Sequence, residues 1–397
     1  MPNTTDKIIR EKVDQAVEVL DELNQDTWLT FCRETSEIDE PCLPFLLGFD
    51  VVWPTMILLT SEGRKEVIIG RHDSANAEEL GIYEVHPYDE SLKATFLDIL
   101  KEIDPETVAV NFSKDNNVSD GLTHGMYLRL KELLEDADYD GELVSSNEIV
   151  KQVRGVKSET EKERIKKAGE ITEELFKGLK ESWEPEWTES DIADWFHDEL
   201  SERGLESAWS WDYCPTVHAG PESEVGHTMP GDISLKPNQV LHMDFGVRYK
   251  GYASDLQRVY YYGEEDDVPQ DLLEAFNDVR DAIDAGFKRL KPGVEGHEVD
   301  SVARDLITNR GWPEYQHALG HQVGRNAHDG GTLLGPTWDR YGDSPYGRVR
   351  EGEVYTLELG VETEYGYVGQ EEMVEITSKG ARYLIPPQER LRFLEGT

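Results

Sequence analysis

The sequence predicts an N-terminal α/β domain over residues 1–150, followed by an α+β domain over residues 151–397. Three observations support this fold class. A chain of 397 residues is longer than most single domains. Helical and strand-like patterns alternate through the first domain, as they do in α/β folds. The composition then changes, because seven of the 11 histidines lie within residues 218–328.

Periodicity predicts the elements of the first domain in order. A helix is expected over residues 7–23, and two apolar strands follow at 55–60 and 66–70, joined by the turn Ser61-Glu62-Gly63. A helix at 91–103, a strand at 107–112 and a helix at 123–134 complete the domain. No glycine-rich loop follows a strand, so nucleotide binding is not predicted.

The basic segment VKQVRGVK at 150–157 is expected to link the two domains. Ser158 and Glu161 form a capping box that predicts a long helix over residues 159–181. The other elements expected in the second domain are helices at 189–203, 271–290 and 297–308 and strands at 239–249, 252–262, 354–363 and 371–377.

The chain is strongly acidic, with 40 Lys+Arg against 82 Asp+Glu and a formal net charge of −42. Such a surface repels phosphate backbones and anionic lipids, so nucleic acids and membranes are not expected as partners. Because the acids are spread along the whole chain, we expect adaptation to high salt, in which screening relieves self-repulsion. Three cysteines without C-x-x-C spacing, and a first segment without an apolar core, predict a reduced cytoplasmic protein.

The first group of candidate site residues is Asp244 and Asp255. Two strands joined by a turn at Lys250-Gly251 would bring these carboxylates close together. A buried carboxylate is costly unless a cation or hydrogen bonds compensate it, which favours a metal site. The alternative, a pair of solvent-facing acids, stays open in a chain that is one-fifth Asp and Glu.

Further candidates lie downstream. His317, His321 and His328 are interleaved with glycines that let the backbone approach a ligand, and Glu358 and Glu371 lie in apolar strands. Two aspartates, one histidine and two glutamates form an oxygen-rich set, which suits two divalent ions bridged by carboxylates better than a structural zinc ion.

The order of these five residues resembles that of the pita-bread metallopeptidases, in the branch of aminopeptidase P, prolidase and creatinase. The motifs that carry the resemblance are Asp244-Phe-Gly with Gly251-Tyr-Ala-Ser-Asp255, Gly320-His321-Gln-Val-Gly324, Thr356-Leu-Glu358 and Glu371-Glu-Met-Val. The resemblance implies a pita-bread catalytic domain over 151–397 behind a creatinase-like domain over 1–150. It also implies two divalent ions (Mn, Co or Zn) held by the metal ligands Asp244, Asp255, His321, Glu358 and Glu371.

The same resemblance implies a function and residue roles. The expected reaction is hydrolysis of a peptide substrate at Xaa-Pro bonds by a hydroxide that bridges the two ions, in a homodimeric enzyme. Glu358 would act as the general base and His328 would stabilise the oxyanion. The substrate would be bound by His227, His317 and His328. His218 and His242 are expected to be structural.

Three positions depart from the family pattern: Gln257 replaces a usual threonine, Leu359 a usual proline and Gly369 a usual arginine. These departures bear on Xaa-Pro specificity more than on metal binding. Two alternatives therefore stay open beside the peptidase. One is a creatinase-like C–N hydrolase acting on a small non-peptide substrate, and the other is a binding homologue without activity.

Salt adaptation is testable by thermal unfolding in KCl. We expect the melting temperature to rise as KCl is increased toward molar concentrations, because screening weakens the repulsion among acids that destabilises the folded state. Differential scanning calorimetry over a KCl series measures this. A melting temperature that stays flat or falls would contradict the hypothesis.

Overall fold

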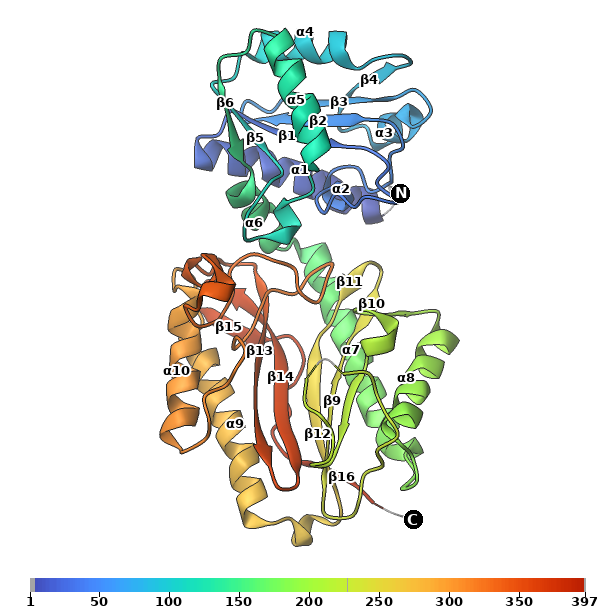
Figure 1. Ribbon diagram of the computed structural model, residues 1–397, viewed down its shortest axis with the longest axis vertical. Helices are drawn as coiled ribbons and strands as arrows, with labels where there is room; N and C mark the ends of the chain where they lie inside the picture. Colours follow the sequence, from blue (N-terminus) through green and yellow to red (C-terminus); the bar gives the residue numbers. More distant parts are fainter. Residues whose placement is uncertain (1–3, 227, 396–397) are drawn as a thin grey trace. The chain divides into compact units, whose positions relative to one another are not determined.

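The computed structural model of the chain describes residues 4–226 and 228–395. It forms two compact units, residues 1–158 and residues 159–397 (Figure 1). The boundary lies eight residues beyond the one expected from the sequence, and the expected linker is wrong. Most of residues 150–157 belong to helix α6 (Asn147–Gly155), whose Ile149, Val150 and Val153 are buried. This amphipathic pattern packs against helix α1 (Thr4–Leu23), where the Lys12 Nζ donates to the Val153 carbonyl at 2.7 Å.

The first unit has the expected α/β class. Its six-stranded mixed sheet has the order β4-β3-β2-β1-β5-β6. The strands are β1 (Thr27–Cys32), β2 (Thr55–Thr60), β3 (Lys65–Gly70), β4 (Glu84–Tyr88), β5 (Thr107–Val110) and β6 (Glu142–Ser145). One core joins the sheet to α1, α6, α2 (Leu43–Leu46) and α3 (Ser74–Leu80). The other joins it to α4 (Lys93–Ile103) and α5 (His124–Asp136).

The second unit has the expected α+β class. Its main sheet has seven strands in the order β13-β14-β12-β9-β8, with β15 beside β14 and β16 beside β12. The strands are β8 (Thr216–Ala219), β9 (Val240–Phe245), β12 (Leu256–Tyr262), β13 (Val354–Thr363), β14 (Gly366–Thr377), β15 (Gly380–Tyr383) and β16 (Arg392–Leu394). A small sheet contains β7 (Glu206–Ser207), β10 (Val247–Tyr249) and β11 (Tyr252–Ala253).

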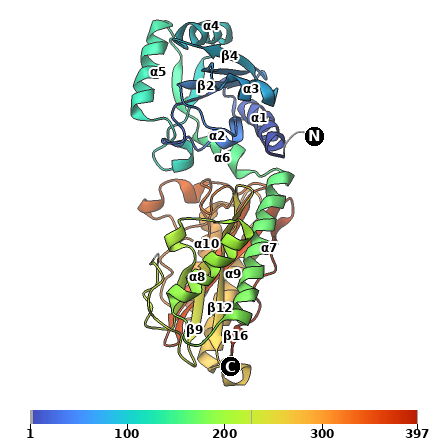
Figure 2. The ribbon, with the colours of Figure 1, turned by 90° about the vertical axis from the view of Figure 1, so that its right-hand side faces the viewer.

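Four helices cover the main sheet (Figures 1 and 2). Helices α7 (Glu159–Ser182) and α8 (Glu189–Arg203) contact the half formed by β8 to β12. Helix α9 (Gln270–Arg289) contacts the half formed by β13 and β14, and α10 (Gly296–Asn309) packs against α9. All four helices coincide with predicted ones to within a few residues. Within residues 4–226 and 228–395, no helix is both long and apolar enough to cross a lipid bilayer.

The hairpin that carries the two aspartates changes sheets at Gly246. The predicted strands 239–249 and 252–262 each break there, into β9 and β10 and into β11 and β12. A Cβ at Gly246 would overlap the carbonyl oxygen of Ser254, so only glycine lets the two chains approach this closely. The crossing leaves Asp244 inside β9 and places Asp255 directly before β12.

Replacing Gly246 should therefore distort the hairpin. We expect Gly246→Ala to lower the free energy of unfolding by about 3 kcal/mol, the upper end for overpacking, because the new methyl group meets backbone that cannot move aside. Chemical denaturation measures this. Gly125→Ala, where a Cβ would meet nothing within 4 Å, is the matched control and should cost nothing. Equal stability of the two variants would show that the approach is not tight.

Candidate metal centre

Four polar side chains form one row across the main sheet. Gln257 on β12 pairs with Asp244 on β9 and with Glu371 on β14, and Glu371 pairs with Glu358 on β13. Directly paired residues point to the same face of a sheet, so all four share one face. The Asp255 carboxylate joins them from just before β12, within hydrogen-bond reach of Asp244. The register thus brings together four acids that lie up to 127 residues apart in sequence.

His321 completes this group from the segment between α10 and β13. Its backbone is fixed on β13, because the Thr356 N–H donates to the His321 carbonyl at 2.8 Å. A Cβ at Gly320 would overlap the Thr356 carbonyl oxygen, so this glycine permits the close approach. The His321 Nε2 lies 3.8 Å from Asp255 Oδ2, 3.7 Å from Glu358 Oε1 and 3.8 Å from Glu371 Oε1.

Burial and mutual repulsion make the ionised forms of these acids costly. Burial raises the pKa of Asp244 to about 7. Burial and then the charge of Asp244 raise the pKa of Glu358 to about 8. The pKa values of Asp255 and Glu371 lie well above their usual range, first from burial and then from the neighbouring carboxylates. The folded chain therefore brings together acids whose ionised forms are costly, and within residues 4–226 and 228–395 no lysine or arginine pairs with them.

The neighbouring Glu372 shows the opposite arrangement. It points to the other face of β14, where it is fully buried 3.2 Å from Arg258 and 3.7 Å from Arg280. Within the described part of the chain, no lysine or arginine forms a salt bridge with Asp244, Asp255, Glu358 or Glu371. Adjacent glutamates in one strand thus differ in that one has cationic partners and the other has none.

The group fits divalent metal ions. The buried Oδ1 atoms of Asp244 and Asp255 have no hydrogen-bond partner. The His321 Nδ1 faces the Gln322 carbonyl at 3.3 Å, which makes Nδ1 the donor and leaves Nε2 bare toward the carboxylates. Burial and then His328 lower the pKa of His321 to about 3, which keeps the ring neutral. Ligand atoms of Asp255, His321 and Glu371 all lie within 4.8 Å of one another, and hard carboxylate donors with one imidazole suit Mn, Co or Zn.

The expected substrate residues are placed less uniformly. His328 is exposed beside the group, its ring 4.2 Å from that of His321 and nearly perpendicular to it. His317 is also exposed, and its ring lies 5.5 Å from the ring of Tyr315. The Tyr315 hydroxyl donates to Glu358 Oε2 at 3.5 Å. The expected substrate residue His227 lies outside the described residues.

Sequence reasoning did not connect Tyr315, Gln257, His242 or His218 to this group. The Gln257 Nε2 donates to Glu358 Oε2 at 3.0 Å, and the Gln257 Oε1 meets His242 Nε2 at 3.0 Å. The His242 Nδ1 lies 3.0 Å from that of His218. A signal was present, because His242 lies two residues before Asp244 and Gln257 two residues after Asp255. The period-two rule places such residues on the same strand face.

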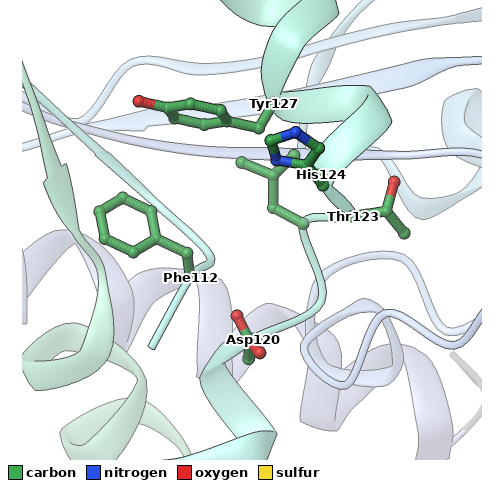
Figure 3. A pocket seen from close by; sticks show the side chains of 6 residues that line it. Phe112, Asp120, Thr123, His124 and Tyr127 are labelled. Carbon is green, nitrogen blue, oxygen red and sulfur yellow. The ribbon is translucent and has the colours of Figure 1, made fainter. Parts of the chain in front are cut away.

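The first unit holds a cluster of metal-binding residue types and a cavity. Glu66, Glu84 and His86 lie close enough to share an ion, but the buried Glu66 already pairs with Arg64 and with His86 at 2.6 Å. A cavity of about 460 Å³ opens where α5 begins, beside the rings of Phe112 and Tyr127 (Figure 3). Asp120 and His124 are its only ionisable lining residues apart from Tyr127, and neither is buried. Neither feature matches the crowding of uncompensated acids around His321.

Comparison with protein families decides the assignment. The family model described as metallopeptidase family M24 matches residues 163–378, more than half of the chain. The chain belongs to metallopeptidase family M24. The match spans all five residues of the candidate metal centre, and the family assignment confirms the resemblance seen in the sequence.

Individual M24 relatives are distant. The chain is 29% identical to an uncharacterized peptidase of Bacillus subtilis (strain 168), over 69% of this chain and 73% of that protein. It is 31% identical to a Xaa-Pro dipeptidase of Lactobacillus delbrueckii subsp. lactis, over 53% of this chain and 55% of that protein. The solved structure of a Xaa-Pro dipeptidase from Bacillus anthracis matches with a TM-score of 0.75 at 22% identity, over 97% of this chain and 100% of that one. This likeness shows the two-domain pita-bread fold.

The two adjacent glutamates of this M24 chain allow a matched test. In metal-free protein at neutral pH and above, we expect Glu371→Gln to raise the free energy of unfolding, because a carboxyl group whose pKa is raised by folding destabilises the folded state above its unfolded pKa, and glutamine carries no such cost. Glu372→Gln should lower it by about 3 kcal/mol, because Arg258 loses one of its two carboxylate partners and Arg280 loses its contact with Glu372 as well. Denaturant titration of the two metal-free variants measures both changes.

Metal addition separates the pair further. With free Mn²⁺ at about 100 times its Kd, wild type and Glu372→Gln should gain about 2.7 kcal/mol of stability, whereas Glu371→Gln should gain much less. Equal gains in the two variants would contradict the assignment of Glu371 to the metal centre.

Proposed function

We propose that this M24 chain is a dinuclear metallopeptidase that hydrolyses Xaa-Pro peptide bonds, as an aminopeptidase or a dipeptidase. The observation that carries the proposal is the crowding of four carboxylates around a neutral imidazole without a neutralising side chain. Such a group is costly in a purely structural role and is stabilised by divalent ions. The Xaa-Pro specificity is supported by the relative from Lactobacillus delbrueckii subsp. lactis, whose name is Xaa-Pro dipeptidase.

In this proposal, Asp244, Asp255, His321, Glu358 and Glu371 hold two ions, of Mn, Co or Zn. Bound divalent ions would lower the pKa of a water molecule and so supply a nucleophile near neutral pH.

The remaining chemistry falls to the side chains of this chain. The Glu358 carboxylate takes a proton from the attacking water and passes it to the leaving nitrogen. It is suited to this because its side chain is partly exposed, at 18%, whereas that of Glu371 is 2% exposed. His328, exposed beside His321, donates a hydrogen bond to the developing oxyanion. His317 and His227 bind the substrate.

The proposal extends to the setting of the enzyme. We place it in the cytoplasm as a homodimer that needs high salt for activity as well as for stability. The intact donor group argues against the binding homologue, because an inactive site has no need to bury acids that repel one another. It also argues against a creatinase-like reaction, which proceeds without the metal ligands.

A peptidase assay in high KCl tests the function. We expect protein loaded with Mn²⁺, Co²⁺ or Zn²⁺ to hydrolyse Xaa-Pro dipeptides or longer Xaa-Pro peptides, and chelated protein to be inactive. Matched Xaa-Ala peptides should be poorer substrates. Glu358→Gln should lower kcat by about 10²–10⁴-fold, the usual contribution of a general base.

Glu362→Gln, an exposed glutamate on the same strand, is the control and should keep full activity. Metal-loaded protein that cleaves none of these peptides would exclude the Xaa-Pro peptidase. Turnover of a small C–N substrate in its place would favour the creatinase-like alternative.

A further inference from the structure

Behind the candidate metal centre lies a continuous line of buried polar side chains on three neighbouring strands. It runs from His218 on β8 through His242 on β9 to Gln257 on β12, and it ends on the Glu358 carboxylate. Each of the three steps has a heavy-atom distance of 3.0 Å. His218, His242 and Gln257 are all less than 7% exposed, so water does not compete for these contacts.

The direction of the Gln257 amide follows from its two neighbours. A carboxylate that ligates a metal must be ionised, and an ionised carboxylate can only accept hydrogen bonds. The amide nitrogen of Gln257 therefore faces Glu358, and the amide oxygen faces His242. The His242 Nε2 must then carry the proton of that contact.

The contact between His242 and His218 also determines which nitrogen of each ring carries the proton. Two facing ring nitrogens need one donor and one acceptor, and a His242 that carries its proton on Nε2 has a bare Nδ1. His218 Nδ1, which faces it, is then the donor. The rings are held nearly parallel at 5.2 Å, and Tyr367 packs edge-on against both. The line therefore has one consistent set of donors and acceptors from His218 to Glu358.

Two glycines leave the space for this arrangement. Gly369 and Gly360 are paired across β14 and β13. A Cβ at Gly369 would lie 2.7 Å from His242 Nε2, 2.6 Å from Tyr367 Cε1 and 2.9 Å from Gln257 Oε1. A Cβ at Gly360 would overlap the Tyr367 hydroxyl. The space that a side chain at 369 would occupy is thus filled by the His242 imidazole, the Gln257 amide and the Tyr367 ring.

We propose that Gln257 is a positioning residue that orients the Glu358 carboxylate for metal binding and proton transfer, and that His242, supported by His218, orients Gln257. This inference rests on the proposed function of Glu358 and adds no group that touches substrate. A single N–H bond to Oε2 leaves Oε1, the atom nearer to His321, directed at the metal centre. Hydrogen-bond partners of metal ligands commonly contribute 10–100-fold to metal affinity or activity.

The test compares two buried glutamines of the same sheet. Gln257→Met keeps the volume of the side chain and removes both of its polar contacts. Gln370→Met is the matched control, since Gln370 is also buried, lies on the opposite face of β14 and donates to the Phe276 carbonyl. Mn²⁺ affinity of the metal-free proteins is measured by titration calorimetry, together with kcat, KM and thermal stability.

We expect Gln257→Met to bind Mn²⁺ about 10–100-fold more weakly and to lose kcat by a similar factor, with little change in KM. Gln370→Met should keep both while losing comparable thermal stability. His242→Phe should show a smaller loss, and the double variant Gln257→Met/His242→Phe should be no weaker than Gln257→Met alone, because His242 acts through Gln257.

Several outcomes would overturn the inference. If Gln257→Met keeps the Mn²⁺ affinity of the wild type, or if Gln370→Met loses as much affinity as Gln257→Met, Gln257 contributes only to packing. Additive losses in the double variant would remove the role of His242. If Gln257→Met does not fold, the loss of affinity expected in His242→Phe decides the matter. Since Mn²⁺ affinity needs no substrate, a wild type that binds Mn²⁺ but cleaves no Xaa-Pro peptide would refute the proposed function and still leave this inference decided by the affinities.

Discussion

The repulsion among four acids gathered at one face of the main sheet is the constraint around which the second unit is built. Removing a carboxylate from water without a partner costs several kcal/mol, so the chain must hold Asp244, Asp255, Glu358 and Glu371 together against their own repulsion. Apolar packing on the other face of β13 stabilises this arrangement, because Leu357, Leu359 and Val361 enter the core there against α9 and α10. The free energy gained by packing the core thus offsets the repulsion at a site that needs cations.

The same sheet shows how the chain treats acids that have no such role. Arg258 is fully buried and reaches Glu173 on α7 at 3.0 Å as well as Glu372 on β14. Arg392 on β16 meets the same Glu173 at 2.6 Å. These pairs tie α7 and the edge strand to the centre of the sheet. Acids paired with arginine therefore connect the elements, and the acids without a lysine or arginine partner among the described residues mark the place where chemistry is expected.

Much of this arrangement could be predicted from the sequence, for reasons that are local. Helices such as α7 and α9 have a regular apolar period, and each acid of the candidate site lies in an apolar strand where it stands out. Strand β1 was missed because it is buried on both faces and has no alternation. The sequence predicts a linker where helix α6 forms, because the charged residues of this segment interrupt its buried apolar stripe. The line from His218 to Glu358 depends on which strands are neighbours, and β8, β9, β12 and β13 acquire that order only through long-range pairing.

Because Glu371 and Glu372 point to opposite faces of β14, insertions and deletions in this strand are constrained. Deleting one residue in β14 ahead of this pair would put Glu372 where Glu371 now lies and turn Glu371 to the opposite face, and an insertion would also turn both side chains over. The acid that faces Arg258 would then join the acidic group, and the other would leave it. Changes of chain length should accordingly be tolerated only in the connecting loops, because even a step of two within the strand would move Glu371 away from its partners Glu358 and Gln257. The site therefore depends on the spacing inside β14 as much as on the side chains that the strand carries.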